Sequence, residues 1–183
     1  MKRIRRLLYP AVPNVGWAPI VLLLMTAAAT LGAWQASGPA SGGYGKWVSE
    51  DVVYIIDDAE RAAFQKLTTD EEREHFVEQF WERRNPVPGS AENKFKVEHY
   101  RRIAFANKHF ATGSGAPGWQ TDRGHMYVLY GPPDEIDSHP KGTPHPWESW
   151  GYRVLGSGSS LGYFRFVDVR GTGDFRLAPS TDR

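Results

Sequence analysis

The side chains with the widest chemical range in this sequence are its six histidines and the carboxylates near them. No two histidines have the H-E-x-x-H spacing that places a pair of imidazoles on one helix face to bind zinc. His139 and His145 flank the loop PKGTP, and a third ligand would have to come from His125, Asp134 or Asp137. Solvated loop histidines explain this spacing more simply, so we predict no metal and no cofactor.

Two short motifs resemble functional signatures but lack the context that those signatures need. GSGAPG (113–118) fits G-x-G-x-x-G, which follows a strand and opens a helix, whereas here we expect a helix before it and a strand after it. GSSLG (158–162) fits G-x-S-x-G, but it lies between two expected strands, where it is a hairpin loop, and no histidine follows it. Asp122 and Asp134 lie at opposite ends of an expected strand, which is not the carboxylate pair of a glycosidase. We therefore name no catalytic residue and favour a non-enzymatic role.

The stretch GWQTDRGHMYVLYGPPD (118–134) allows a structural and a functional interpretation. In the structural one, Trp119 anchors the end of the sheet, Asp122 accepts hydrogen bonds in a tight turn and Arg123 pairs with a carboxylate. HMYVLY (125–130) is then a strand, and the prolines of GPPD end it because they cannot donate to a ladder. In the functional one, Trp119, Asp122 and Arg123 line a polar pocket at the entrance of that strand.

A second candidate binding segment is HPWESWGYR (145–153). Trp147 and Trp150, next to Tyr152 and Arg153, could recognise a peptide, a glycan or a partner protein, since aromatic and Arg side chains dominate binding surfaces. Packing within a sheet explains the same aromatic residues, so both interpretations stay open.

Three helices are expected before residue 111, each with a capping signal and an apolar face at helical spacing. The expected caps, in chain order, are Asp57 or Asp58, then Thr69 in a capping box with Glu72, and then Ser90 for a helix that runs to about His109. The expected inner faces are Phe76, Val77, Phe80 and Trp81 on the second helix, and Phe95, His99, Ile103, Ala106 and Phe110 on the third.

Strand signals follow the segment ATGSGAPG (111–118). Four short runs rich in aromatic and β-branched residues are separated by Gly, Pro and Ser: HMYVLY, ESWGYRVL, LGYFRFVDV and DFRLA. Helices followed by strands favour an α+β fold, in which N-terminal helices pack on a small, mostly antiparallel sheet of about four strands.

Composition and charge exclude several classes of protein. A chain of 183 residues with 40% hydrophobic and 23% charged residues suits one globular domain plus an appendage. The first 36 residues hold four of the 22 Lys and Arg and none of the 21 acids, so the remainder has a net charge of −3. A domain with a slight excess of negative charge lacks the excess of basic residues that is typical of nucleic-acid-binding proteins. The absence of cysteine excludes disulfides, thiolate metal sites and a cysteine nucleophile.

The N-terminus predicts export. MKRIRRLLYP is basic, and residues 18–36 form an uncharged, largely apolar run, which is the layout of a secretory signal. The run is close to the ~20 residues of a spanning helix, so an uncleaved membrane anchor is the alternative. We expect a signal or anchor over 1–36, a Gly/Ser-rich linker over 37–45 and one folded domain over 46–183. The domain would face the periplasm or cell envelope.

The pentad of Gly118, Trp119, any residue, Thr121 and Asp122 resembles the signature of the bacterial GWxTD-domain family. The resemblance extends over a helical half with the turn FW-x-x-R-N-P and over the segments DRGHMYVLYGPPDEI, PWESWGY and FVDVRGTGDFRL, hence over about 46–177. Asn85 stands in that turn where the family often has Asp. The resemblance implies the domain boundaries and agrees with export, but it implies no reaction, ligand or catalytic residue.

These observations lead to one expected function and one alternative. We expect a non-catalytic binding or assembly module of the cell envelope, with an envelope protein, a peptide or a glycan as its partner. The alternative is a hydrolase of an envelope polymer, assisted by a metal that some of His125, Asp134, His139 and His145 would hold.

Overall fold

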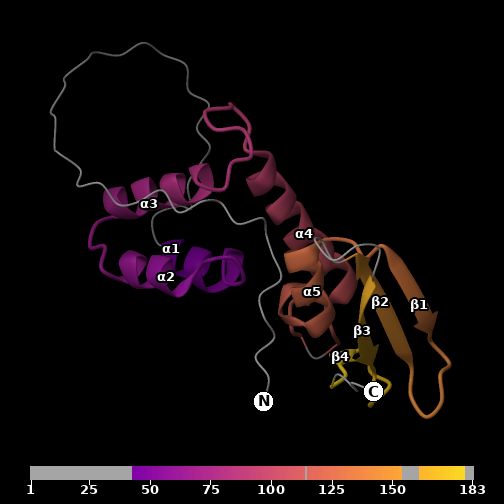
Figure 1. Cartoon of the computed structure of the whole chain (residues 1–183). Coiled ribbons are helices and arrows are strands. Elements are labelled where there is room, and N and C mark those ends of the chain that lie inside the picture. Colours follow the sequence, from indigo (N-terminus) through magenta and orange to yellow (C-terminus); the bar gives the residue numbers. More distant parts are fainter. Residues whose placement is uncertain (1–42, 114, 154–160, 180–183) are drawn as a thin grey trace, which may run out of the picture.

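The structure, a computed structural model, describes residues 43–113, 115–153 and 161–179. Helices form one half, a sheet forms the other, and a long helix joins them (Figure 1). The helical elements are α1 (Tyr44–Lys46), the π-helical turn η1 (Trp47–Asp51), α2 (Asp58–Gln65), α3 (Asp70–Glu82), α4 (Lys94–Phe110), the 3-10 turn η2 (Gly118–Gln120) and α5 (Asp122–Tyr130). The strands are β1 (Glu135–His139), β2 (Trp147–Arg153), β3 (Leu161–Val167) and β4 (Arg176–Leu177).

Capping boxes start α2 and α3. The Asp57 carboxylate accepts the Glu60 N–H at 2.7 Å, and the Glu60 carboxylate accepts the Asp57 N–H at 3.2 Å. Thr69 and Glu72 form the same reciprocal pair, at 3.2 and 3.1 Å. Each box gives partners to N–H groups that the first helical turn leaves without any. The predicted starts of both helices are therefore confirmed.

The first hydrophobic core lies among α1, η1, α2 and α3. At its centre Trp47 is 1% exposed, and its ring lies 5.4 Å from Phe64 and 5.1 Å from Phe80, measured between centroids. Tyr44 is also buried here. Segment 1–36 and the predicted linker up to residue 42 lie outside the described residues. Within the described ranges, no helix is long and apolar enough to cross a membrane.

Helix α4 takes part in both halves of the fold. Asn93 caps it through a side-chain oxygen that accepts an N–H of the first turn at 3.0 Å, so the predicted cap at Ser90 is wrong. The Ser90 hydroxyl instead donates to a carbonyl two residues on, within the preceding loop. Near the start of α4, Trp81 of α3 packs against it, and at its end Phe110 lies 5.5 Å from Trp150 of β2.

The sheet has the order β1-β2-β3-β4, and every neighbouring pair is antiparallel, so the predicted α+β class is confirmed. Helices α4 and α5 cover one face, here called the inner face (Figure 1). Trp150, Tyr152 and Phe166 point into the second core on this face, and all three are buried. Because side chains alternate along a strand, Trp147 and Arg165 lie on the opposite, outer face.

The segment HMYVLY was expected as a strand, and this prediction is wrong, because the segment lies in helix α5. The Thr121 hydroxyl caps the helix by accepting a first-turn N–H at 3.1 Å, and Gly131, at a φ of 81°, ends it. Met126, Tyr127 and Val128 are consecutive and all buried, since they contact different core clusters around the helix. A short apolar run that is enclosed on several sides has no period that distinguishes a helix from a strand.

The strand that replaces it is β1, whose sequence EIDSH gives no apolar alternation. All five of its residues are exposed, which explains why no hydrophobic signal marks it. The segment GSGAPG follows helix α4 as expected, but η2 and α5 come after it where a strand was predicted. The expected hairpin loop at GSSLG lies outside the described residues except for its last two, which begin β3.

Candidate binding site

The Gly118–Asp122 stretch lies between α4 and α5, where backbones approach closely. A Cβ at Gly118 would overlap the carbonyl oxygen of Ala106 on α4, and a Cβ at Gly124 would overlap the carbonyl oxygen of Gly118. Both positions therefore require glycine for space. The two contacts hold η2 against α4 and α5 against η2, which stacks three helical elements at this point.

Trp119 is anchored from two directions. Its N–H donates to the Asn107 side chain of α4 at 3.1 Å, and its carbonyl accepts the Tyr54 hydroxyl at 3.0 Å. The Tyr54 ring also lies edge-on to the Trp119 ring, with centroids 5.9 Å apart. Burial raises the pKa of Tyr54 to about 12, so its hydroxyl stays protonated and remains a donor. Trp119 is 9% exposed and joins the segment after η1 to α4.

Asp122 closes one edge of the sheet. Its carboxylate accepts the Leu177 N–H of β4 at 2.7 Å, and a second oxygen lies 3.9 Å from the Arg176 guanidinium. Arg176 is well exposed, so the hydrogen bond matters more than this ion pair. The carboxylate therefore holds the last strand against the N-terminal turn of α5.

Arg123 connects α5 to the inner face of the sheet. Its guanidinium lies 3.3 Å from the Glu148 carboxylate of β2, and the two side chains are 13% and 19% exposed. The same group lies over the Phe175 ring at 4.1 Å and donates to the Gly173 carbonyl at 3.3 Å. Glu148 also accepts the indole N–H of Trp150 at 3.1 Å. This is a partly buried charged network with its hydrogen bonds made inside the chain.

The three residues predicted to line a pocket at the start of HMYVLY thus point to different partners. Trp119 contacts α4 and Tyr54, Asp122 contacts β4, and Arg123 contacts β2. The backbone of Trp119 and the charged groups of Asp122 and Arg123 bond within the fold, as the structural interpretation of this stretch expects. A ligand-binding role for them stays a prediction.

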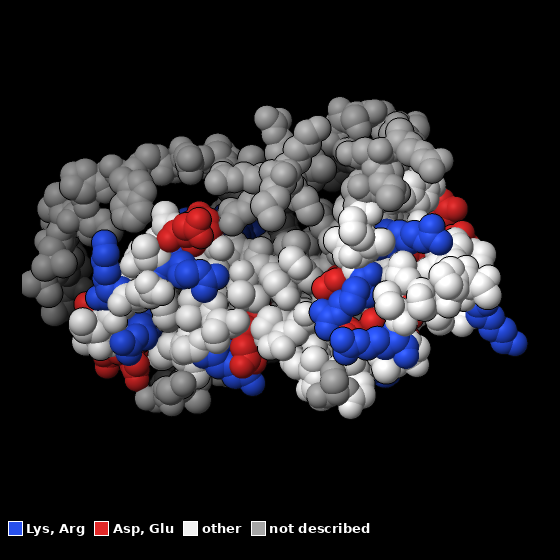
Figure 2. Space-filling model, turned by 90° about the horizontal axis from the view of Figure 1, so that it is seen from below, with Lys and Arg blue, Asp and Glu red and all other residues white. Residues whose placement is uncertain are grey.

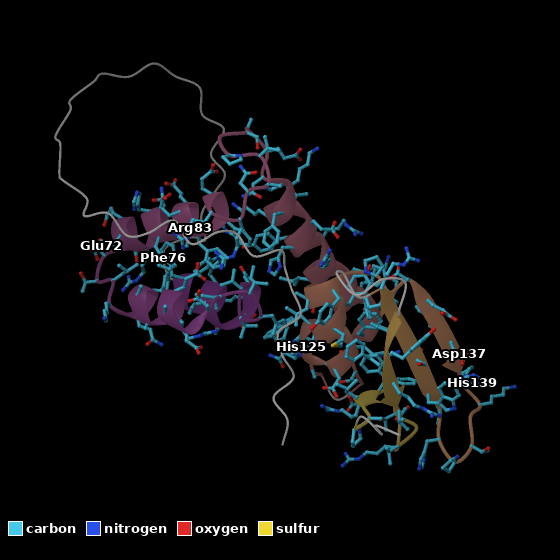
Figure 3. All side chains as sticks on the ribbon, viewed as in Figure 1. Glu72, Phe76, Arg83, His125, Asp137 and His139 are labelled. Carbon is cyan, nitrogen blue, oxygen red and sulfur yellow. The ribbon has the colours of Figure 1, made fainter. Side chains whose placement is uncertain are left out.

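The two tryptophans of the second candidate segment lie on opposite faces of the sheet. Trp150 is 2% exposed in the core, so it has no surface to offer a ligand in this fold. Trp147 lies on the outer face, with its ring 3.9 Å from the His139 ring and 4.0 Å below the Arg165 guanidinium. Figure 3 shows His139 next to Asp137 at this end of the sheet, and their side chains are 2.8 Å apart.

The outer face continues from this stack along β3. Tyr163 is 58% exposed, and its hydroxyl donates to the Glu135 carboxylate of β1 at 3.1 Å. Its ring crosses Gly151, where a Cβ would lie 3.0 Å from it. Sequence reasoning did not name Tyr163, Arg165 or His139 for this surface, although the alternation in LGYFRFV places Tyr163 and Arg165 on one face.

His125 and His139, two of the histidines proposed as metal ligands, lie apart in the fold. His125 lies on α5 and stacks on Tyr54 at 3.9 Å, away from His139 on β1 (Figure 3). Burial lowers the pKa of His125. Across the described parts of the chain, no group of three or more His, Cys, Asp or Glu side chains is arranged to hold a metal ion. The proposed ligands of the metal-assisted hydrolase are therefore not arranged as a metal site in the described residues.

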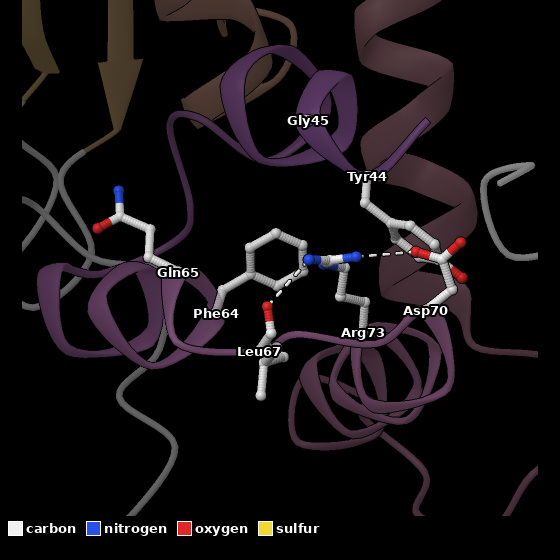
Figure 4. A pocket seen from close by; sticks show the side chains of 7 residues that line it. All are labelled: Tyr44, Gly45, Phe64, Gln65, Leu67, Asp70 and Arg73. Atoms are coloured by element: carbon white, nitrogen blue, oxygen red, sulfur yellow. Dashed lines mark hydrogen bonds and ion pairs between the residues drawn. The ribbon is translucent and has the colours of Figure 1, made fainter. Parts of the chain in front are cut away.

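A shallow depression of about 290 Å³ lies in the helical half, among Tyr44, Phe64 and Leu67 (Figure 4). Arg73 crosses it, donating to the Leu67 carbonyl and to the Asp70 carboxylate, both at 2.9 Å. The Arg73 guanidinium is therefore already bonded within the chain, and Gln65 and Asp70 are the other polar side chains of the lining. On the face shown in Figure 2, basic and acidic side chains are interspersed, so no broad field of one sign marks a binding area there.

The fold and the site define an α+β domain with helices and sheet joined by α4 and braced by the Gly118–Asp122 stretch. The sequence matches the family model of the GWxTD domain over residues 38–176, and the chain belongs to this family, as the resemblance predicted. No curated protein and no solved structure matches the chain.

Proposed function

We propose that this chain is an exported or membrane-anchored cell-envelope protein whose folded domain binds a partner and catalyses no reaction. The basic and apolar N-terminus supports the location, because it has the layout of an export signal. Among the described residues no helix covers the outer face of the sheet (Figure 1), which supports the binding role. A peptide, a glycan or a partner protein is the expected ligand.

The observation that carries this proposal is the stack of His139, Trp147 and Arg165 on the outer face. Trp, Tyr and Arg provide most of the binding energy at protein surfaces. In this stack Trp147 and Arg165 are held in place by contact with each other before a ligand binds, so less side-chain entropy is lost on binding. Among the described residues Arg165 forms no ion pair, which leaves its guanidinium N–H groups for a carbonyl, carboxylate or hydroxyl oxygen of the ligand.

The test is retention of envelope components on the immobilised full-length chain in mild detergent. The wild type is compared with the Trp147→Ala, Arg165→Ala double variant and with Arg101→Ala, an exposed position on α4, as the matched control. We expect the wild type and the control to retain the same component and the double variant to lose it. Equal retention by all three, or no specific retention at all, would refute a binding role for this face.

A further inference from the structure

The two edges of the sheet are treated differently. At β4, the Ala178 N–H donates to the Arg165 carbonyl of β3 at 2.7 Å, so the N–H of its neighbour Leu177 points away from the sheet. Asp122 accepts that outward N–H at 2.7 Å. The edge at β4 is therefore short and closed by a side chain, which is how proteins protect an edge from added strands.

Among the residues that the structure describes, no strand or side chain closes the edge at β1. Arg153 donates its N–H to the Asp134 side chain, and the Gly151 carbonyl accepts the Asp134 N–H, so both residues of β2 face β1. Backbone N–H and C=O groups alternate in direction along a strand, so every second residue of β2 faces β1. The β1 residues paired with them are Glu135, Asp137 and His139, whose backbone groups therefore point toward β2. The N–H and C=O groups of Ile136 and Ser138 then point outward. In the described part of the chain, β1 pairs with β2 alone.

The side chains along this edge differ on its two sides. On the outer face, Glu135 and Asp137 present carboxylates, and the Asp137 side chain is 60% exposed. On the side of the inner face, Ile136 is 55% exposed, because the helical layer covers its neighbour Trp150 but does not extend over β1. A strand added here would meet negative charge on one side and an apolar surface on the other.

Building on the binding role proposed above, we infer that the β1 edge binds an extended segment of another protein in which Lys or Arg alternates with apolar residues. The backbone groups of Ile136 and Ser138 would supply hydrogen bonds to the added strand. Its basic side chains would lie beside Glu135 and Asp137, and its apolar side chains would cover Ile136. The ligand needs basic and apolar residues in alternation because successive side chains of a strand point to opposite faces. The basic side chains then lie on the face of the two carboxylates, and the apolar side chains lie on the face of Ile136.

A second copy of this chain fits the edge less well. In an antiparallel pair of two β1 strands centred on the middle residue, Asp137 of each copy would lie directly opposite the other. Like charges in that position destabilise a strand pair. A basic segment of a different protein removes this repulsion and replaces it with attraction.

The test uses a fluorescent seven-residue peptide in which Lys alternates with Val, capped at both ends, and the full-length chain in nonionic detergent. Ser138→Pro removes one outward N–H but no bond to β2, and proline is tolerated at such an edge position. Ser138→Ala is the matched control, since it keeps the N–H. We expect Ser138→Pro to weaken peptide binding by about tenfold, the loss of one well-formed hydrogen bond, and Ser138→Ala to bind as the wild type. A peptide with Glu in place of Lys should not bind.

Each outcome has a distinct meaning. Equal binding to the proline and alanine variants, with matching circular dichroism, or no binding to the wild type, would overturn the edge inference. A dimer in analytical ultracentrifugation that Ser138→Pro dissociates would overturn it in favour of self-pairing. The binding-module proposal is judged separately, because retention of an envelope component by the wild type and by Ser138→Pro alike would keep that proposal and reject only the edge.

Discussion

Replacing Asp122 with alanine tests whether the Gly118–Asp122 stretch is a structural brace. The substitution removes the carboxylate that accepts the Leu177 N–H at 2.7 Å and leaves that N–H of β4 without its protein partner. It also removes an acidic group from the first turn of α5. Both losses destabilise the native state.

The expected magnitude follows from these two contacts. A hydrogen bond to a charged group contributes about 1.5–3 kcal/mol, and the lower half applies here because the Asp122 side chain is 35% exposed. The charge at the helix N-terminus adds about 0.3–1 kcal/mol. The free energy of unfolding should therefore fall by about 2 kcal/mol, which lowers the Tm by roughly 6–10 °C for a domain of this size.

The assay is thermal unfolding of the full-length chain, followed by circular dichroism, with Asp58→Ala as the control. Asp58 occupies the same first position in α2 as Asp122 does in α5, and it is exposed. The two variants share the loss of the helix-terminal charge, so their difference isolates the bond to Leu177. If the Tm of Asp122→Ala lay within a degree of the control, the brace would be wrong, and Trp119, Asp122 and Arg123 would return as a candidate ligand site.

Three further predictions follow from the same structure. Gly118→Ala should lower the free energy of unfolding in denaturant by about 3 kcal/mol because its Cβ meets backbone, whereas Gly45→Ala, which meets open space, should change it by less than about 0.5 kcal/mol. Burial lowers the pKa of His99 to about 4, so the unfolded chain takes up the proton first as the pH falls. The free energy of unfolding should therefore be highest above about pH 6.5 and fall by roughly 3 kcal/mol as the pH is lowered to 4. Denaturant titrations at several pH values measure this decrease, and His99→Gln should lack it. Arg123→Met should destabilise by about 2–3 kcal/mol by leaving Glu148 unpaired, and adding Glu148→Gln should restore part of the loss; additive effects in this double-mutant cycle would contradict the pairing.

The helical half of the fold was predictable because its signals are local. The capping boxes at Asp57 and Thr69 mark helix starts by themselves, and the spacing of apolar residues marks the buried faces. The third helix shows the limit of this reasoning, since Ser90 and Asn93 are equally good caps in the sequence. Only the position of the preceding loop, where the Asn93 amide also donates to the Trp81 carbonyl, decides between them.

The sheet half was predicted less well because its elements depend on tertiary surroundings. HMYVLY is a helix since α4 and the sheet enclose it, and EIDSH is a strand since β2 supplies a partner. The spacing of apolar residues within these two segments predicts neither the helix nor the strand. The same limit applies to the candidate site, where adjacent residues Asp122 and Arg123 were grouped together. On a helix they point in different directions, and each reaches a different strand.

The long helix that joins the two halves also sets a distance. Helix α4 has 17 residues, which corresponds to about 25 Å along its axis. The described chain begins at the helical end of the molecule, and β1 lies at the far side of the other end (Figure 1). In a chain tethered through its N-terminus, the open strand would therefore lie at the end of the domain away from the first described residues, with α4 as the spacer between them (Figure 1).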